Sequence, residues 1–151
     1  MLSQQEFEAI LGDSSKRIVG DLSWSEDEDH SPALYFRACI GTAAGHPLTV
    51  SGRFNALSGK LSFAIHHRSV GRIYALDLGV GHRNPSGAQL GEKHKHRWTE
   101  RHGDREAYVP EDITCAVDDP VGVWREFCVE ATIHHDGTLA PPPARQLELG
   151  L

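Results

Sequence analysis

Apolar residues alternate with polar ones along four consecutive runs in the middle of the chain. The runs lie at 34–40, 48–54, 61–65 and 70–78, and short polar turns join them. Alternation with period two is typical of strands that bury one face, and short turns between such strands favour antiparallel hairpins. The pattern therefore predicts an antiparallel meander with one face turned to solvent.

Two helices are predicted to flank this meander. Ser3 and Glu6 have the spacing of a capping box, and apolar residues on one helical face follow them. Asp119 can cap a second helix with Pro120 at its first position, and apolar residues at helical spacing then continue to about Ile133. These elements predict an α+β fold in which a sheet of five or six strands packs one face against both helices.

Shorter segments complete the predicted organisation. Further strands are expected at 16–24, 94–100 and 106–109, where apolar or alternating residues recur between turns. Residues 1–139 are predicted to form a single α+β domain. The segment 140–151 carries three prolines in a row directly after Ala140, and it is predicted to be an extended tail because proline fits neither a helix interior nor a central strand.

Composition places the chain among ordinary globular proteins. Its 151 residues are 39% hydrophobic and 24% charged, which suits one domain with one core. It contains no run of about 18 apolar residues and no secretory signal, so a cytoplasmic location without membrane association is expected. The three cysteines, Cys39, Cys115 and Cys128, are odd in number and widely spaced. They favour free thiols in a reducing compartment over a disulfide or a cysteine metal site.

The formal net charge is −6, and the charges are unevenly placed. An acidic protein is a poor candidate for nonspecific nucleic-acid binding, which depends on lysine and arginine neutralising phosphates. The run Glu26–Asp29 is wholly acidic, whereas residues 93–105 carry five lysines and arginines. Such a local basic strip suits a small anionic ligand or an acidic partner surface, although either run can also be a simple solvated face.

Histidines supply the candidate chemistry, because six of the ten lie within residues 66–102. On an extended strand His94, His96 and Glu100 share one face, since strand side chains alternate. His82 lies in a glycine-rich loop and could join them from a second segment. The set His82, His94, His96 and Glu100 predicts a site for a divalent metal of the zinc or manganese class with a position left open for water.

A second interpretation of the same residues needs no metal. His94 and His96 could act as general base and general acid, because the pKa of histidine lies close to neutral pH. Arg83, Lys95 or Arg97 could then hold an anionic group, which makes hydrolysis of a phosphate-containing substrate the expected chemistry. The alternative without function is a solvated strand that happens to carry two histidines.

Three segments together resemble a family of small uncharacterised proteins from bacteria and their mobile elements. They are His-Arg-Asn-Pro-Ser-Gly at 82–87, His-Lys-His-Arg-Trp-Thr-Glu at 94–100 and Gly-Asp-Arg-Glu-Ala-Tyr at 103–108. The resemblance covers roughly residues 60–133. It implies that the His-x-Asn-Pro-x-Gly loop and the His-x-His strand form one unit, and it carries no assigned activity. The mobile-element setting implies a role in defence, counter-defence or toxicity.

A rival hypothesis assigns the chain no catalysis. A small acidic protein could be an inhibitor or adaptor of the anti-CRISPR kind that binds a protein partner. In that case the run Glu26–Asp29 would imitate phosphate charge toward a basic partner. A plain structural subunit is the third alternative.

Overall fold

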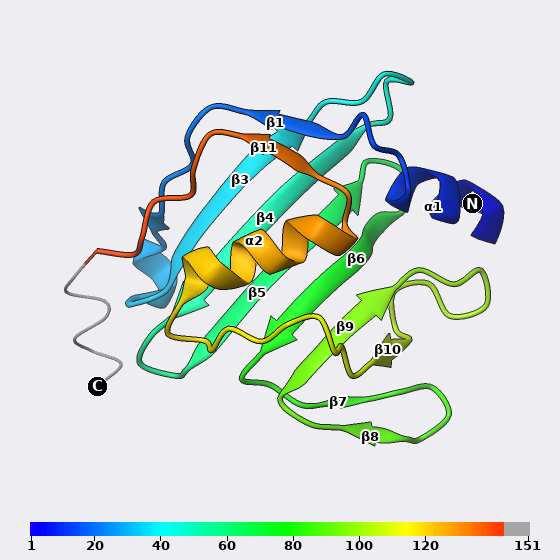
Figure 1. The fold of residues 1–151 in the computed structure, drawn as a ribbon. Helices are drawn as coiled ribbons and strands as arrows, with labels where there is room; N and C mark the ends of the chain where they lie inside the picture. Colours follow the sequence, from blue (N-terminus) through cyan, green and yellow to red (C-terminus); the bar gives the residue numbers. More distant parts are fainter. Residues whose placement is uncertain (144–151) are drawn as a thin grey trace.

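The computed structural model describes residues 1–143, and its central element is a seven-stranded antiparallel sheet (Figure 1). The helices are α1 (Gln4–Leu11), the 3-10 turn η1 (Glu28–His30) and α2 (Pro120–Glu130). The strands are β1 (Arg17–Val19), β2 (Ser25–Glu26), β3 (Leu34–Ile40), β4 (Leu48–Asn55), β5 (Lys60–His67), β6 (Gly71–Leu78), β7 (His82–Arg83), β8 (Gln89–Leu90), β9 (Lys93–Arg97), β10 (Ala107–Tyr108) and β11 (His134–Asp136). The predicted α+β class is confirmed.

The strands of the main sheet follow the order β10-β9-β6-β5-β4-β3-β2. Strands β3 to β6 form the predicted meander, and β9 then pairs with β6 after the short β7–β8 hairpin. The segment 25–32, expected as an exposed loop, instead contributes β2 and η1. Both residues of β2 are exposed, so the strand has no apolar alternation and is defined only by its pairing with β3.

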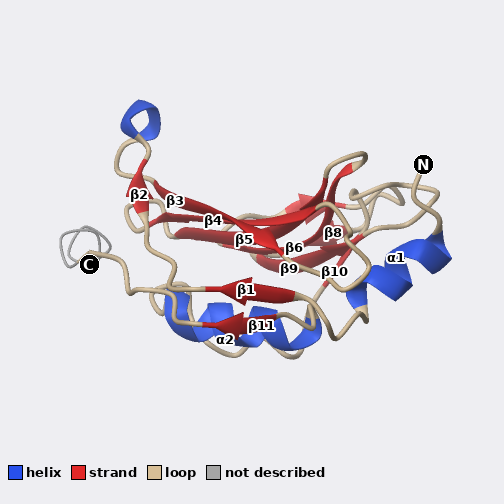
Figure 2. Ribbon diagram, turned by 90° about the horizontal axis from the view of Figure 1, so that it is seen from above, coloured by secondary structure: helices blue, strands red, loops and turns tan. Residues whose placement is uncertain are grey.

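The expected strand at 16–24 is shorter and pairs outside the main sheet. Strand β1 lies parallel to β11, with Ile18 opposite His135. This two-stranded sheet lies with α2 on one side of the main sheet (Figure 2). Of the expected tail at 140–151, residues 140–143 have no regular secondary structure and residues 144–151 lie outside the described residues. Neither helix in residues 1–143 combines the length and apolar character that a membrane crossing requires.

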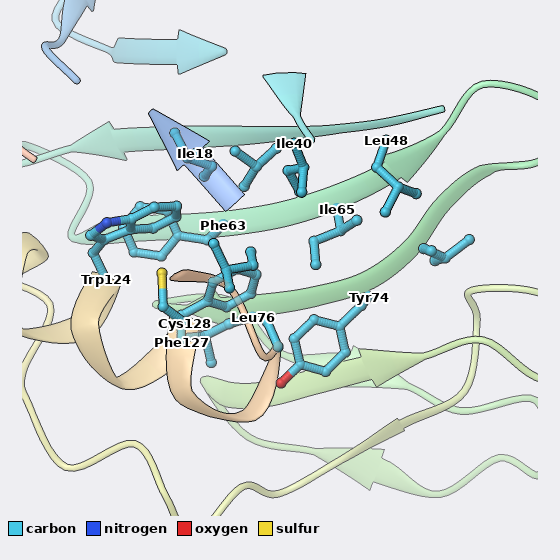
Figure 3. Close-up of a cluster of buried hydrophobic side chains, with 14 of the residues drawn as sticks. Ile18, Ile40, Leu48, Phe63, Ile65, Tyr74, Leu76, Trp124, Phe127 and Cys128 are labelled. Atoms are coloured by element: carbon cyan, nitrogen blue, oxygen red, sulfur yellow. The ribbon is translucent and has the colours of Figure 1, made fainter. Parts of the chain in front are cut away.

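Aromatic side chains fill the space between α2 and the sheet (Figure 3). The Phe63 ring lies 5.1 Å from the Trp124 ring and 5.6 Å from the Phe127 ring, centroid to centroid. Burial of each such ring contributes about 1.5–3 kcal/mol. Gly52 is required on this side of the sheet, because a Cβ there would lie 2.1 Å from the ring of Phe36.

The other side of the sheet is polar, and no α-helix of residues 1–143 covers it (Figure 2). We call this side the open face. It arises because the polar residues of strands β3 to β6 and β9 alternate with those that face α2. Its side chains include Tyr35, Arg37, Cys39, Thr49, Ser51, Arg53, Ser62, His66, Arg72, Asp77, His94 and His96.

Lys16 closes the C-terminal end of α1. Its side chain is fully buried, and its ammonium group donates hydrogen bonds to the carbonyls of Ile10, Leu11 and Asp13. Three donors are present only on the protonated amine. Burial lowers the pKa of Lys16 to about 8, so the amine still carries its charge at neutral pH.

Replacement of this lysine tests its contribution. We expect Lys16→Met to lower the free energy of unfolding by about 1–3 kcal/mol, because buried carbonyls at the end of α1 lose their donor. Urea denaturation followed by circular dichroism measures the change. Lys60→Met, at an exposed position, should change the free energy by less than about 0.5 kcal/mol. Equal losses in both variants would contradict this role for Lys16.

Candidate metal centre

Three histidines from two separate segments meet at one edge of the open face. Each of His82, His94 and His96 offers a ring nitrogen within 4.8 Å of the other two. His94 and His96 project from alternate positions of β9, and their ring centroids are 4.9 Å apart. The ring of His82, from β7, lies 5.4 Å from that of His94 and 4.6 Å from that of His96. The structure therefore brings the three sequence-predicted imidazoles together.

The loop that carries His82 is fixed by a buried amide. Asn84 is 8% exposed, and its side chain bonds both backbone groups of Ala107. Its Oδ1 accepts from the Ala107 amide at 2.9 Å, and its Nδ2 donates to the Ala107 carbonyl at 2.8 Å. The Asn84 amide thus satisfies the backbone N–H and C=O of Ala107, as a paired strand would. This tie holds the β7–β8 hairpin against the segment that follows β9.

Each histidine also uses one ring nitrogen to donate a hydrogen bond to a backbone carbonyl. The bonds run from His82 Nε2 to Arg105 at 2.7 Å, from His94 Nδ1 to Gly91 at 3.3 Å and from His96 Nδ1 to Asp104 at 2.8 Å. A carbonyl can only accept, so these nitrogens carry the ring protons. In the neutral form of each ring, the other nitrogen keeps its lone pair. Carbonyl partners of this kind commonly orient histidines that bind metals.

Asp77 adds a carboxylate to the cluster. It lies on β6 directly opposite His94, and its Oδ2 is 3.2 Å from Nε2 of both His94 and His96. Lone pairs at this separation repel one another unless a proton or a metal ion lies between them. Ligand atoms around a tetrahedral zinc ion, with bonds of about 2.0–2.1 Å, are about 3.3 Å apart. The spacing therefore fits a small cation held between these groups.

The cluster is largely shielded from water. His94 and His96 are 1% and 2% exposed, whereas His82 is half-buried and the side chain of Asp77 is 15% exposed. Burial lowers the pKa of His94 below its ordinary value, which favours the neutral ring that a metal requires. Burial alone would raise the pKa of Asp77, but the contact with His96 and the charge of Arg72 outweigh it and keep this pKa low. The carboxylate is thus charged at neutral pH.

Glu100, predicted as the carboxylate ligand, is not part of the cluster. Strand β9 ends at Arg97, so the alternation that aligned Glu100 with the histidines does not reach it. Thr99 and Gly103 bridge a turn there, and the Glu100 carboxylate accepts a hydrogen bond from the amide of Gln4 at the start of α1. Asp77 provides the carboxylate in its place.

The three residues expected to hold an anion also lie elsewhere. Lys95 and Arg97 alternate with the histidines along β9 and therefore point to the opposite side of the sheet. Lys95 is fully buried there, and Arg97 pairs with Glu8 at 3.0 Å. Arg83 donates to the carbonyl of Gly87 within its own loop. None of these contacts involves the histidine cluster.

Arg72 is the arginine that faces the cluster instead. Its Nη1 lies 3.8 Å from Asp77 Oδ2, and its Nε donates to Asp104 at 2.9 Å. Sequence reasoning missed both Arg72 and Asp77. The only signal for Asp77 was a charged residue between Leu76 and Leu78 in a strand with alternating apolar residues.

Two carboxylate variants separate these assignments. We expect Asp77→Asn to weaken zinc binding about 10–100-fold, because the amide removes a negative charge beside two candidate ligands. Glu100→Gln should leave zinc affinity within about twofold of the parent, since Glu100 contacts α1 and not the histidines. Isothermal titration of zinc into both proteins makes the comparison. A larger loss from Glu100→Gln than from Asp77→Asn would reverse their roles.

Comparison with known protein families gives one match. The sequence model of a family described as "Family of unknown function (DUF6978)" matches residues 2–133, which include the three histidines and Asp77. The comparisons with curated proteins and with solved structures gave no match.

Proposed function

The chain belongs to this family of unknown function, and we propose from the histidine cluster that it is a metal-binding protein. The ion is divalent and of the zinc or manganese class. Its ligands are His82, His94 and His96, and Asp77 is either the fourth ligand or the partner of a metal-bound water. Three imidazole nitrogens favour zinc over manganese, because manganese prefers carboxylate and water ligands.

One observation carries this proposal. The ring nitrogens that bond to carbonyls leave lone pairs on the remaining nitrogens, and Asp77 Oδ2 lies 3.2 Å from two of them. A purely structural histidine cluster would be expected to contain internal donors that satisfy its acceptors. With all three rings neutral the cluster has no internal donor for these acceptors, and a bound metal ion would stabilise the arrangement in place of a ring proton.

Metal uptake by the purified protein tests the proposal. After treatment with a chelator, the protein should bind one zinc ion per chain in isothermal titration and bind manganese more weakly. Zinc at about 100 times its dissociation constant should stabilise the fold by about 2.7 kcal/mol, which is measured as a rise in melting temperature. Absence of both binding and stabilisation would rule out a metal centre.

We further propose that the centre hydrolyses a phosphate-containing substrate. Asp77 also lines a cavity of about 400 Å3 together with Ser62 and Arg53. Asp77, Ser62 and Arg53 form one cross-strand row on the open face, so the cavity begins beside the candidate ligands. A substrate phosphate in this cavity would lie beside the metal centre and would accept hydrogen bonds from the N–H groups of Arg53 other than the one that donates to Asp27.

The proposed reaction needs only water as co-reactant. A zinc ion held by His82, His94 and His96 would supply a Lewis acid that makes a nearby water easier to deprotonate. The water oxygen bonds to phosphorus while the bond from phosphorus to the leaving oxygen breaks. Asp77 takes the proton from the water and returns it to the leaving oxygen. The products are a phosphate and an alcohol.

A chromogenic diester tests the hydrolysis separately from metal binding. The zinc-loaded protein should release nitrophenol from bis(4-nitrophenyl) phosphate, and Arg53→Gln should raise KM while zinc affinity is unchanged. Zinc binding without any turnover of phosphodiesters or phosphomonoesters would leave the metal centre standing and exclude the hydrolase.

The rival function as an inhibitor or adaptor uses the acidic edge of the sheet. Glu26, Glu28 and Asp29 are exposed on β2 and η1, whereas Asp27 pairs with Arg53 at 2.7 Å. An exposed edge strand with acidic side chains suits a basic protein partner. Alanine at the three exposed positions should then weaken capture of that partner, and unchanged capture would count against this role.

Two further features belong to the proposal. The His-x-Asn-Pro-x-Gly loop and the His-x-His strand would be the functional unit of this family in bacteria and their mobile elements, with Asn84 as its positioning residue. A cytoplasmic location fits the free thiols Cys39, Cys115 and Cys128, because reducing compartments keep such thiols unpaired.

A further inference from the structure

A second cavity, at one end of the sheet, is lined by cationic and imidazole side chains. It has a volume of about 670 Å3 and lies where β3 and β5 end and β4 begins. Its lining includes Arg37, Arg68, His46, His66 and His67. No aspartate or glutamate is among the lining residues, although the protein as a whole carries a net charge of −6. The charge of this cavity is therefore opposite to that of the molecule.

The two arginines of this cavity differ from their neighbours on the open face. Arg53 and Arg72 each pair with an aspartate, at 2.7 and 2.9 Å. Arg37 and Arg68 form no ion pair with any group in residues 1–143. Guanidinium groups without an internal carboxylate partner are free to bind an external anion, and their planar geometry matches that of phosphate.

The histidines add hydrogen-bonding groups. Burial lowers the pKa of His66 and of His67, so both rings are neutral near pH 7. The Nδ1 of His67 accepts a hydrogen bond from the amide of Ser69 at 3.1 Å, which leaves Nε2 as a donor in the neutral ring. His66 Nε2 lies 3.0 Å from the hydroxyl of Ser51. The cavity thus combines two permanent charges with neutral polar groups.

We propose that this cavity binds a small phosphate-bearing ligand through Arg37 and Arg68. The volume lies within the range of about 300–1,000 Å3 that small-molecule sites occupy, and it exceeds what one inorganic phosphate fills. The ligand is therefore a phosphorylated small molecule larger than inorganic phosphate, and the two arginines favour one that carries more than one negative charge. None of the metal-centre residues lines this cavity, so the proposal does not depend on the proposed metal.

Pyrophosphate is a suitable probe for isothermal titration at low ionic strength. The metal-free protein should bind one pyrophosphate, more tightly than it binds inorganic phosphate. The variant Arg37→Gln/Arg68→Gln should weaken binding at least about tenfold, because each charge-assisted contact is lost. Lys60→Gln/Arg125→Gln is the matched control, since it removes two exposed positive charges that lie outside this cavity. An equal loss in this control would show that net charge alone is responsible and would overturn the proposal.

Cys39 gives a readout that locates the ligand. Its exposed thiol lines the cavity, whereas Cys128 is buried. Saturating pyrophosphate should slow alkylation of Cys39 by iodoacetamide at least several-fold, as measured by peptide mass mapping, while the rate at Cys115 stays the same. An unchanged rate at Cys39 would place the ligand elsewhere and refute the proposal. Loss of pyrophosphate binding in His94→Ala/His96→Ala would assign the ligand to the metal centre and refute it equally.

Discussion

Replacing His94 and His96 together with alanine is expected to lower zinc affinity at least a hundredfold. The change removes two of the three convergent imidazoles and leaves Asp77 without the two nitrogens that lie 3.2 Å from its Oδ2. No other group of at least three metal-ligating side chains lies close together in residues 1–143, so the affinity cannot be recovered elsewhere in that part of the chain. Isothermal titration of the chelator-treated protein measures the loss.

Both histidines are buried, so the double variant needs a check of folding. Far-ultraviolet circular dichroism and urea denaturation of the metal-free proteins show whether the fold persists. The single variant His82→Ala, at a half-buried position, gives an independent measurement of zinc affinity with a smaller loss of folding stability. His134→Ala removes an exposed histidine on β11 and should bind zinc like the parent. Parent-like zinc affinity in the double variant would disprove the proposed centre.

Replacing Lys95 with methionine should destabilise the fold by about 2–4 kcal/mol. The fully buried ammonium lies 2.6 Å from Asp112 and 3.0 Å from Glu130. Removing one partner of a buried ion pair leaves the other charge uncompensated. Both carboxylates keep partial contact with solvent, 39% and 31% exposed, which moderates the penalty. Urea denaturation gives the free energy of unfolding.

The penalty of Lys95→Met is expected to depend on pH through Glu130. Burial alone would raise the pKa of Glu130, but hydrogen bonds from Tyr74, Tyr108 and Lys95 lower it below its ordinary value of 4.5. A carboxylate with a lowered pKa stabilises the fold above that value, and the stabilisation is lost as the pH falls through the folded-state pKa. The penalty of Lys95→Met should therefore shrink in acid.

Two controls separate this effect from the metal centre. The folded Lys95→Met protein should keep parent zinc affinity, because Lys95 and the histidines lie on opposite sides of β9. Lys93→Met, on the same strand, loses only a contact with the carbonyl of Ile113 and should cost less than about 1 kcal/mol. A Lys95→Met protein as stable as the parent would mean that the ion pairs contribute nothing net.

Local patterns in the sequence predict much of the fold. The capping box at Ser3 and Glu6 is present at α1, and Asp119 caps α2 with Pro120 in its first turn. The meander is also local, since neighbouring strands are joined by short turns. The pairing of β9 with β6 is nonlocal, because the β7–β8 hairpin lies between them in the sequence. Two-residue strands such as β2 have too few side chains to form an alternating pattern.

The residues of the candidate site also divide into those that local patterns predict and those that depend on nonlocal pairing. Alternation along one strand correctly places His94 and His96 on a common face. The same alternation places Lys95 on the other face, so including it among the anion-binding residues conflicted with the pattern itself. Asp77 could not be found this way, because its position beside the histidines depends on the nonlocal pairing of β6 with β9. The alternation extends to Glu100 only if the strand does, and the end of β9 at Arg97 has no clear signal in the sequence.

Strand β9 places two incompatible environments on consecutive residues. His94 and His96 face the proposed metal, and Lys95 between them faces a pair of carboxylates in the core. A slip of one residue in its pairing with β6 would exchange the two sets. Lysine would then enter the metal pocket, and imidazoles would replace the ammonium beside Asp112 and Glu130. Zinc binding would therefore indicate that β9 pairs with β6 in the correct register. Chains with a shifted register would fail to retain the ion.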